Sequence, residues 1–300
     1  MFNLFDGLEK LGFMNIDAVE IYKEEEAPGK GVSKADAPDI NPEDYLYDKT
    51  FSCPVCGGDF MNRIIRNGKV KLISTDSDLR SRYDPLDPLF YEVILCTKCG
   101  YAALHTMFSK ITEKTAERVL KEIRPVFKPR TYPAVYDIET AIERLKLALY
   151  NCVVRNARDG EKAYICLKLA WLYRDLGDTE GEAVFQKHAV TGFISSLQHD
   201  NFPLCGLDEN LVTYIVAETL RRLGDFETSL RWFSKLAVTP NLSPRLKDRV
   251  IDQRAQLKKD RDLLLAEIEG ENGAKEEPVK TELPKPKKAK HNKKKSWLFQ

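Results

Sequence analysis

Two Cys-x-x-Cys pairs carry the clearest chemistry in this chain of 300 residues. The pairs occupy residues 53–56 and 96–99, and Gly57 and Gly100 follow them directly. This spacing lets one tight turn direct two sulfur atoms at a single point, and the glycine accepts the left-handed backbone that such a turn needs. Two turns brought together form a tetrahedral site of four cysteines, which is a ligand set of structural zinc. The sequence therefore predicts one zinc ion held by Cys53, Cys56, Cys96 and Cys99.

The predicted metal is structural rather than catalytic, because four thiolates leave no coordination position for a substrate. The other three cysteines have no metal spacing, and we expect Cys152 and Cys166 on apolar helix faces and Cys205 beside Pro203. We expect His105 at the start of a helix or in the core. An odd number of cysteines, seven, fits a reducing cytoplasm better than a disulfide framework.

Strand signals surround the cysteine pairs and predict a zinc ribbon over residues 45–108. Residues 60–66 and 69–75 look like strands, and Asn67-Gly68 lies between them. Asn-Gly is a strong hairpin signal, because both turn residues must accept positive φ. A third strand over residues 91–95 leads into the second cysteine pair. We therefore expect two cysteine turns on a small three-stranded sheet.

The gap between the pairs, residues 57–95, holds 39 residues, where simple ribbons hold roughly 15–20. The excess falls in residues 76–88, which we expect to form an inserted loop, a common location of functional residues. Its candidate ligand-binding side chains are Asp76, Asp78, Arg80 and Tyr83. The two carboxylates and the arginine could bind a polar ligand or pair with one another.

The rest of the chain, residues 109–269, predicts helices and contains a repeated turn. Leu176-Gly177-Asp178 recurs as Leu223-Gly224-Asp225, 47 residues later, and small residues, Ala170 and Ala217, precede the two glycines by seven positions. This pattern resembles the tetratricopeptide repeat, an antiparallel helix pair whose stacked copies form a concave binding surface.

The two predicted helix pairs span about residues 161–199 and 208–240. Their spacing departs from the usual 34 residues, so an ordinary helical bundle without a groove stays open as an alternative. Each Gly-Asp turn should reverse the chain and cap the next helix, and Thr179 with Glu182 has the spacing of a capping box. A last helix is expected over residues 244–269, with a favourable proline in its first turn.

The ends of the chain differ in composition from its centre. We expect a short helix and extension over residues 1–22, an acidic linker over 23–44 and a disordered lysine-rich tail over 271–300. The tail holds nine Lys and four Glu, a net charge of +5, so the other 270 residues sum to −4 within the chain total of +1. The N-terminus is a poor signal peptide, and no run of residues is apolar enough to span a membrane.

The chain resembles, over roughly residues 1–240, the bacterial proteins catalogued as domain-of-unknown-function family 2225. The resemblance is carried by Phe5-Asp6-Gly7-Leu8-Glu9-Lys10, Lys49-Thr50-Phe51-Ser52-Cys53-Pro54-Val55-Cys56, Asp76-Ser77-Asp78, Tyr83, Pro88-Leu89-Phe90-Tyr91-Glu92-Val93 and Cys99-Gly100-Tyr101-Ala102-Ala103. It implies a bacterial cytoplasmic protein with a zinc-ribbon-like start and a helical-repeat remainder, and it supplies no established activity.

These patterns predict an α+β fold, in which a small zinc-ribbon β module precedes an all-α tetratricopeptide-like domain. The function we expect is that of a zinc-stabilised cytoplasmic scaffold or adaptor that binds a protein partner through its helical repeats. The partner's identity and the oligomeric state do not follow from the sequence.

Two other functions compete with the scaffold. The first is nucleic-acid binding by the basic ribbon and the lysine-rich tail, because basic strands beside aromatic rings can grip phosphate and stack a base. The residues concerned are Arg63, Arg66, Lys69, Lys71, Arg80 and Arg82, with Phe60 and Tyr83 nearby. The net charge of −4 outside the tail opposes this function. The second is an enzyme with a polar site in the 76–88 loop, but no nucleophile–base pattern accompanies the loop and we assign no catalytic residue.

Overall fold

Six strands pair as three separate antiparallel hairpins in the computed structural model, which describes residues 6–12 and 42–275. Strand β1 (Leu46–Ser52) pairs with β2 (Asp59–Ile65), and β3 (Lys71–Thr75) pairs with β4 (Ser81–Asp84). Strand β5 (Val93–Leu95) pairs with β6 (Ala102–Leu104). Each of the two cysteine turns connects the strands of one hairpin, β1 to β2 and β5 to β6.

The predicted hairpin between residues 60–66 and 69–75 is wrong, because β2 is paired along its whole length with β1. Asn67-Gly68 does form a turn, with Gly68 at a φ of 73°, but this turn connects two different hairpins. The first cysteine turn brings β1 against β2 within a few residues, so the nearer partner forms the ladder. Strand β1 could not be identified from the sequence, because only Leu46 of its seven residues is buried and its apolar residues do not alternate with polar ones.

The predicted three-stranded sheet and the predicted inserted loop are also corrected. Strand β5 pairs with β6 rather than with either earlier strand. Within residues 76–88, β4 extends the hairpin that begins with β3, and only residues 76–80 form its turn. This turn is closed by the Asp76 N–H, which donates to the Arg80 carbonyl at 2.8 Å. Strand β4 carries no apolar alternation that could have identified it.

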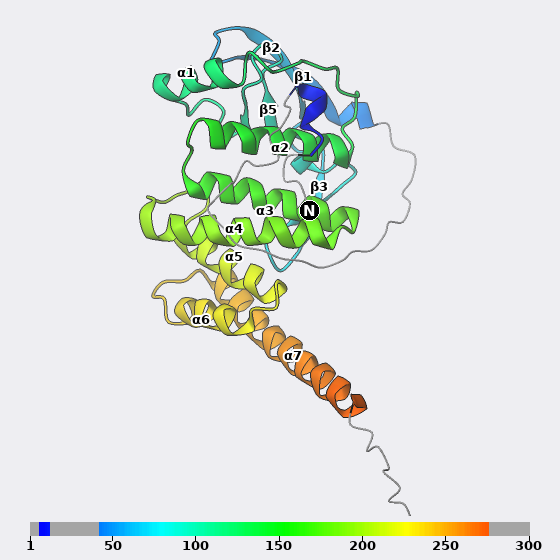
Figure 1. Cartoon of the computed structure of the whole chain (residues 1–300), viewed down its shortest axis with the longest axis vertical. Coiled ribbons are helices and arrows are strands. Elements are labelled where there is room, and N and C mark those ends of the chain that lie inside the picture. Colours follow the sequence, from blue (N-terminus) through cyan, green and yellow to red (C-terminus); the bar gives the residue numbers. More distant parts are fainter. Residues whose placement is uncertain (1–5, 13–41, 276–300) are drawn as a thin grey trace, which may run out of the picture. The chain divides into compact units, whose positions relative to one another are not determined.

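Within the described part of the chain, seven α-helices follow the strands, so the mixed α+β class is as predicted. The helices are α1 (Glu113–Glu122), α2 (Ile138–Val154), α3 (Asp159–Leu176), α4 (Thr179–His199), α5 (Glu209–Arg222), α6 (Phe226–Ala237) and α7 (Pro244–Lys275). Figure 1 shows α2 to α6 stacked in chain order, and β1, β2 and β5 lie against the α2 end of this stack. Three short 3-10 helices, Leu8–Leu11, Pro42–Tyr45 and Pro88–Tyr91, complete the elements of the described residues.

The repeated Gly-Asp turns have the same geometry in both helix pairs. Gly177 and Gly224 have φ angles of 74° and 83°, and each following aspartate caps the next helix. The Asp178 carboxylate accepts from the Gly181 N–H at 2.9 Å, and Asp225 accepts in the same way at the start of α6. Since Asp178 already occupies the N-cap of α4, the predicted capping box beginning at Thr179 is wrong.

One hydrophobic core joins the hairpins to the helices. It extends from Leu8, which is fully buried, through the cysteine turns to Ile215 of α5. Helix α2 lies at its centre and carries polar side chains that reach the hairpins: Arg144 donates to the Val93 carbonyl at 2.7 Å, and Asn151 donates to the Gly100 carbonyl at 3.1 Å. Residues up to Lys258 accordingly cluster as one compact unit, and the chain from Lys259 forms a second.

The predicted terminal segments are only partly described. Within the predicted segment 1–22, residues 8–11 form a 3-10 helix, and most of the predicted linker lies outside the described residues. Helix α7 continues to Lys275, so the predicted start of the tail at residue 271 falls inside a helix; the rest of the tail also lies outside the described residues. None of the helices described here is both long enough and apolar enough to cross a membrane.

Candidate metal centre

The four predicted ligand sulfurs lie together in the structure. All four Sγ atoms are within 4.8 Å of one another. The Sγ atoms of Cys53 and Cys99 are 3.7 Å apart, and those of Cys56 and Cys96 are 3.8 Å apart. Zinc–sulfur bonds of about 2.3 Å at tetrahedral angles place two sulfurs about 3.8 Å apart, so the cluster has the dimensions of a zinc site.

The two cysteine turns are built alike. In the first, the Gly57 N–H donates to the Cys53 carbonyl at 2.9 Å and the Cys53 N–H donates to the Gly58 carbonyl at 3.1 Å. In the second, the Gly100 N–H donates to the Cys96 carbonyl at 2.9 Å, and the Cys96 N–H donates across the hairpin at 2.8 Å. Gly57 and Gly100 have φ angles of 70° and 76°, as the spacing predicted.

The electrostatics of the cluster favour a bound cation. Cys53, Cys96 and Cys99 are buried, and Cys56 is half-buried. The hydrogen bond with Cys96 raises the pKa of Cys53 to about 12, and the hydrogen bond with Cys53 raises the pKa of Cys99 well above its ordinary value. Four sulfurs this close cannot all become thiolates without a compensating charge. A divalent ion supplies that charge, and its binding therefore stabilises the folded turns.

The four cysteine sulfurs would by themselves complete the tetrahedral coordination shell of a zinc ion. The zinc ion that fits here would cross-link the β1–β2 and β5–β6 turns, with Cys53, Cys56, Cys96 and Cys99 as its ligands. Aromatic side chains pack beside the site, including Tyr101, whose hydroxyl donates to the Phe108 carbonyl at 3.1 Å. The arrangement supports a structural role and offers no open coordination position.

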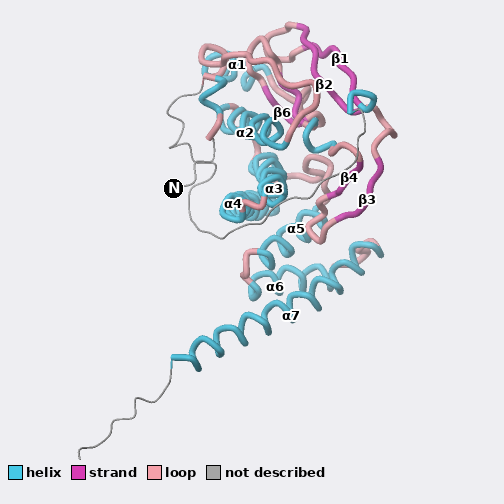
Figure 2. The backbone as a smooth tube through the Cα atoms, turned by 90° about the vertical axis from the view of Figure 1, so that its right-hand side faces the viewer, coloured by secondary structure: helices cyan, strands magenta, loops and turns pink. Residues whose placement is uncertain are grey.

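The candidate loop residues meet helices α3 and α5, where the hairpin β3–β4 packs (Figure 2). Asp78 is fully buried and accepts from Trp171 Nε1 at 3.0 Å and from Arg174 Nη2 at 2.5 Å. Arg80 is 2% exposed and forms ion pairs with Asp87 and, at 2.8 Å, with Asp175. The contacts with Trp171, Arg174 and Asp175 connect the hairpin to α3.

The other two candidates differ in their surroundings. Asp76 pairs with Arg82 at 2.7 Å, and its carbonyl accepts from Arg249 of α7 at 3.2 Å. Tyr83 lies on β4 opposite Leu72 and takes part in none of the hydrogen bonds described for this region. The structure thus brings Asp76, Asp78 and Arg80 together and leaves Tyr83 at the edge of the group.

Asp76, Asp78 and Arg80, together with the side chains that bond to this loop, form a cluster that we call the charge network. Sequence reasoning missed most of these partners. The further members of the charge network are Ser77, Arg82, Asp87, Trp171, Arg174, Asp175, Glu182, Tyr214, Glu218, Arg221, Arg222 and Arg249. Burial alone would raise the pKa of Asp78, but Arg174 and Arg222 outweigh burial and hold that pKa below its ordinary value. The carboxylate is therefore charged and fully paired, which fits a structural clamp better than an open ligand site.

Several basic residues considered for nucleic-acid binding are also paired. Arg63 forms an ion pair with Asp48 at 2.8 Å, and Arg80 and Arg82 belong to the charge network. Arg66, Lys69 and Lys71 remain exposed. Phe60 is 5% exposed and packs in the core, so its ring is not available to stack on a base.

The remaining cysteines and His105 occupy three kinds of environment. Cys152 and Cys166 are fully buried on helices, as expected, and Cys205 is half-buried. His105 is exposed in the turn after β6, where its ring packs edge-on against Phe51 with centroids 6.0 Å apart. The prediction of a core or helix-start position for His105 is therefore wrong.

Comparison with known families gives one match, over residues 46–259, to the family described as "Uncharacterized protein conserved in bacteria (DUF2225)". The chain belongs to this family. The DUF2225 match contains both cysteine pairs, the charge network and both Gly-Asp turns, and it begins after the segment that includes Phe5. No curated protein and no solved structure matched the chain.

Proposed function

We propose that this member of DUF2225 is a zinc-stabilised adaptor that binds a protein partner through the helix pairs α3–α4 and α5–α6. The observation that carries the proposal is the duplicated turn, in which Gly177-Asp178 and Gly224-Asp225 close two successive helix pairs in the same way. Stacked helix pairs of this tetratricopeptide-like kind chiefly serve as extended surfaces for partners.

Two features support binding rather than catalysis. The metal centre has four cysteine ligands and offers no position for a substrate. The carboxylates of the charge network bond within the chain: Asp78 bonds to α3, Asp175 of α3 pairs with Arg80, and Glu218 of α5 accepts from Ser77 at 2.5 Å. Among its arginines, only Arg80 Nε and Arg174 Nη1 are buried without a hydrogen-bond partner in the described residues. Neither region supplies an accessible nucleophile with an adjacent base, which a hydrolytic or transfer reaction requires.

The partner surface is expected on α4 and α6. The turn of the β3–β4 hairpin covers faces of α3 and α5, the first helices of the two pairs, so a partner could not occupy those faces without displacing it. On α6, Trp232 is half-buried, whereas Phe185 at the same repeat position of α4 is fully buried. Lys235 lies over the Trp232 ring at 5.4 Å, and Trp beside cationic residues is typical of the residues that dominate binding energy at interfaces.

The test is capture of interacting proteins by the full-length, zinc-loaded chain from a bacterium that encodes it. Reversing two exposed charges of α6, with Arg231→Glu and Lys235→Glu, should abolish retention of a specific protein. The matched control reverses two exposed charges of α1, Arg118→Glu and Lys121→Glu, and should retain that protein. Equal retention by both variants, or retained nucleic acid released by moderate salt, would contradict the adaptor proposal.

Nucleic-acid binding keeps one favourable observation. Arg66 lies over the exposed Tyr47 ring at 5.3 Å, next to the exposed Lys69 and Lys71, so cations and an aromatic ring share one surface. Oligonucleotide binding that weakens steeply with salt and is lost when Arg66, Lys69 and Lys71 are changed to alanine would favour this second function.

A further inference from the structure

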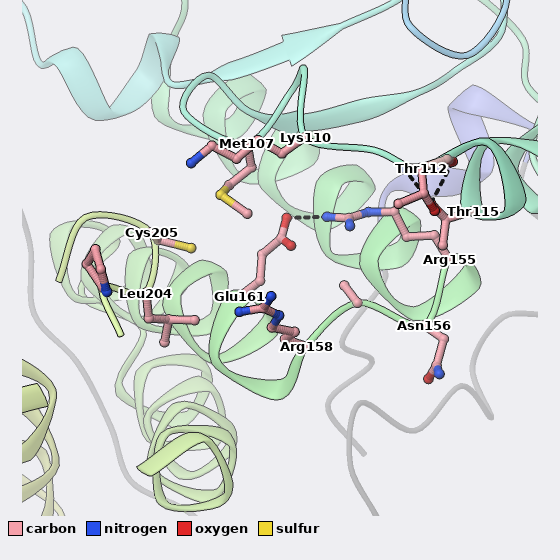
Figure 3. Close-up of a pocket in the computed structure, with 12 residues that line it drawn as sticks. Met107, Lys110, Thr112, Thr115, Arg155, Asn156, Arg158, Glu161, Leu204 and Cys205 are labelled. Carbon is pink, nitrogen blue, oxygen red and sulfur yellow. Dashed lines mark hydrogen bonds and ion pairs between the residues drawn. The ribbon is translucent and has the colours of Figure 1, made fainter. Parts of the chain in front are cut away.

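A cavity of about 380 Å³ lies apart from the metal centre and from the charge network (Figure 3). Three segments line it: residues 107–115, which run from the turn after β6 into the start of α1; residues 155–161, which run from the end of α2 into the start of α3; and residues 203–205 between α4 and α5. Its volume falls at the lower end of the range of small-molecule sites, about 300–1,000 Å³. No function described above uses this cavity.

The lining of the cavity is positively charged. Lys110, Arg155 and Arg158 contribute three cations, and Glu161 is the only acidic residue among its lining residues. Glu161 is 3% exposed and forms an ion pair with Arg155, so it holds that guanidinium in place and its charge offsets one of the three cations. The excess of two positive charges suits a dianion.

Arg155 supplies the second indication of a ligand. Its side chain is 7% exposed, and Nη2 donates to Glu161 and to Cys152 Sγ at 3.4 Å. Its Nε is buried and has no hydrogen-bond partner among the described residues. The Nε atoms of Arg80, Arg130 and Arg144 are in the same state, but of these four arginines only Arg155 lines the cavity. A buried donor without a partner has lost its hydration, so an acceptor in the cavity would compensate it. Figure 3 shows the Arg155 guanidinium directed at Glu161, between the lining segments.

The start of α3 directs the positive end of its helix dipole at the cavity, and the acidic residues of its first turn, Asp159 and Glu161, offset part of this potential. Arg158 is the N-cap residue of α3, and it makes no side-chain capping bond to the first turn. Helix N-termini of this kind favour anions through their free N–H groups and their dipole. Cys205 does not oppose an anion, because burial raises the pKa of its thiol to about 12 and the side chain stays neutral.

Apolar side chains lie among the cations of the lining. Met107 and Leu204 contribute apolar side chains to the lining. Gly160 makes the position of Leu204 possible, since a side chain on Gly160 would collide with Leu204 and with Ser196. A ligand with one strongly charged end and a small uncharged body matches this combination of cationic and apolar side chains.

We propose that this cavity binds a small phosphorylated molecule, with its phosphate against Arg155, Arg158 and Lys110 and its body against Met107 and Leu204. Arginine guanidinium groups match the geometry of phosphate oxygens, and the buried Nε of Arg155 gains an acceptor. The proposal concerns a site separate from the partner surface on α4 and α6, and it stands whether or not the adaptor function holds.

Isothermal titration calorimetry of the full-length, zinc-loaded protein tests the site, with glycerol 3-phosphate, inorganic phosphate, glycerol and citrate as probes. Glycerol 3-phosphate should bind most tightly, inorganic phosphate more weakly, and glycerol not at all. Arg158→Ala and Lys110→Ala change exposed side chains and should each weaken binding about tenfold, the loss expected for one charge-assisted hydrogen bond.

The control variants Lys114→Ala and Arg118→Ala remove exposed positive charges of α1 outside the lining and should bind as the unchanged protein does. Arg155→Lys keeps the charge but removes the Nε donor, and it should weaken binding while circular dichroism shows an unchanged fold. Absence of binding by both phosphate probes, equal binding by all variants, or tighter binding of citrate with the same arginine dependence would each overturn the proposal.

Discussion

Replacing Asp78 with alanine tests whether the charge network clamps the β3–β4 hairpin onto the helices. The Asp78 side chain is 1% exposed and that of its partner Arg174 is 17% exposed. Removing the carboxylate leaves Arg174 Nη2 and the Trp171 N–H without this acceptor, while Arg174 Nε keeps its bond to Glu182 at 2.7 Å. Loss of one partner from a buried ion pair costs ~3–5 kcal/mol in the free energy of unfolding.

A surface pair provides the matched comparison. Asp48 and Arg63 form an ion pair of similar length, but their side chains are 40% and 26% exposed. Solvent-exposed pairs contribute ~0–1 kcal/mol, so Asp48→Ala should change stability little. Both substitutions remove one carboxylate that pairs with an arginine, and they differ chiefly in burial.

Urea unfolding of the zinc-loaded protein measures both effects, with the free energies compared at equal m-values. For a unit of this size, a loss of ~3–5 kcal/mol corresponds to a fall of about 6–20 °C in Tm. A double-mutant cycle that adds the single variant Arg174→Met and the double variant Asp78→Ala/Arg174→Met isolates the coupling between the two side chains. If Asp78→Ala costs no more than Asp48→Ala, the clamp does not exist and the loop candidates return to consideration as ligand-binding residues.

Three further predictions concern the metal turns and pH. Cys96→Ser should lower the zinc content measured by elemental analysis and lower the Tm, because metal binding in such sites contributes folding free energy; full zinc content in this variant would rule out the assigned ligands. Gly57→Ala and Gly100→Ala both place a side chain at positive φ, but only Gly100→Ala also collides with Phe127, so it should lower the Tm further; equal losses would contradict the described packing. Burial lowers the pKa of His188 from 6.5 to about 4, so the unfolded state binds the extra proton between these values and stability falls as pH decreases from 6.5 to 4. Replacing His188 with glutamine should flatten that decline by up to ~1.4 kcal/mol per pH unit in urea titrations, and an unchanged slope would show that His188 is not protected.

The metal site was readable from the sequence because its determinants are local. The spacing within residues 53–56 and 96–99, and the glycine after each pair, fix the turn geometry with no reference to the rest of the chain. The Gly-Asp turns were readable for the same reason, since the left-handed glycine and the capping aspartate act within one turn. A motif whose geometry depends on about four consecutive residues can therefore be identified from the sequence alone.

The strand pairing could not be predicted from the sequence, because β2 has a candidate partner on each side and the sequence does not show which of the two pairs with it. Asn67-Gly68 carries a strong local hairpin signal, and it is overridden because the first cysteine turn has already paired β2 with β1. The partners of residues 76–80 were hidden for a related reason. Arg174 and Glu218 lie some hundred or more positions along the chain, and nothing in their neighbourhood marks them as buried counterions.

Helix α2 connects the metal centre to the helix pairs, so a metal ion bound there would affect the helices as well as the two cysteine turns. Asn151 of α2 donates to the carbonyl of Gly100, the residue that completes the second cysteine turn, and Arg144 bonds to Asn62 of β2 at 2.7 Å. Because α2 packs against α3 in the same core, a loosened second cysteine turn would remove the Asn151–Gly100 bond and weaken the support of the first helix pair. A metal ion held by the four cysteines would thus stabilise the helices that carry the proposed partner surface, although none of these cysteines belongs to a helix.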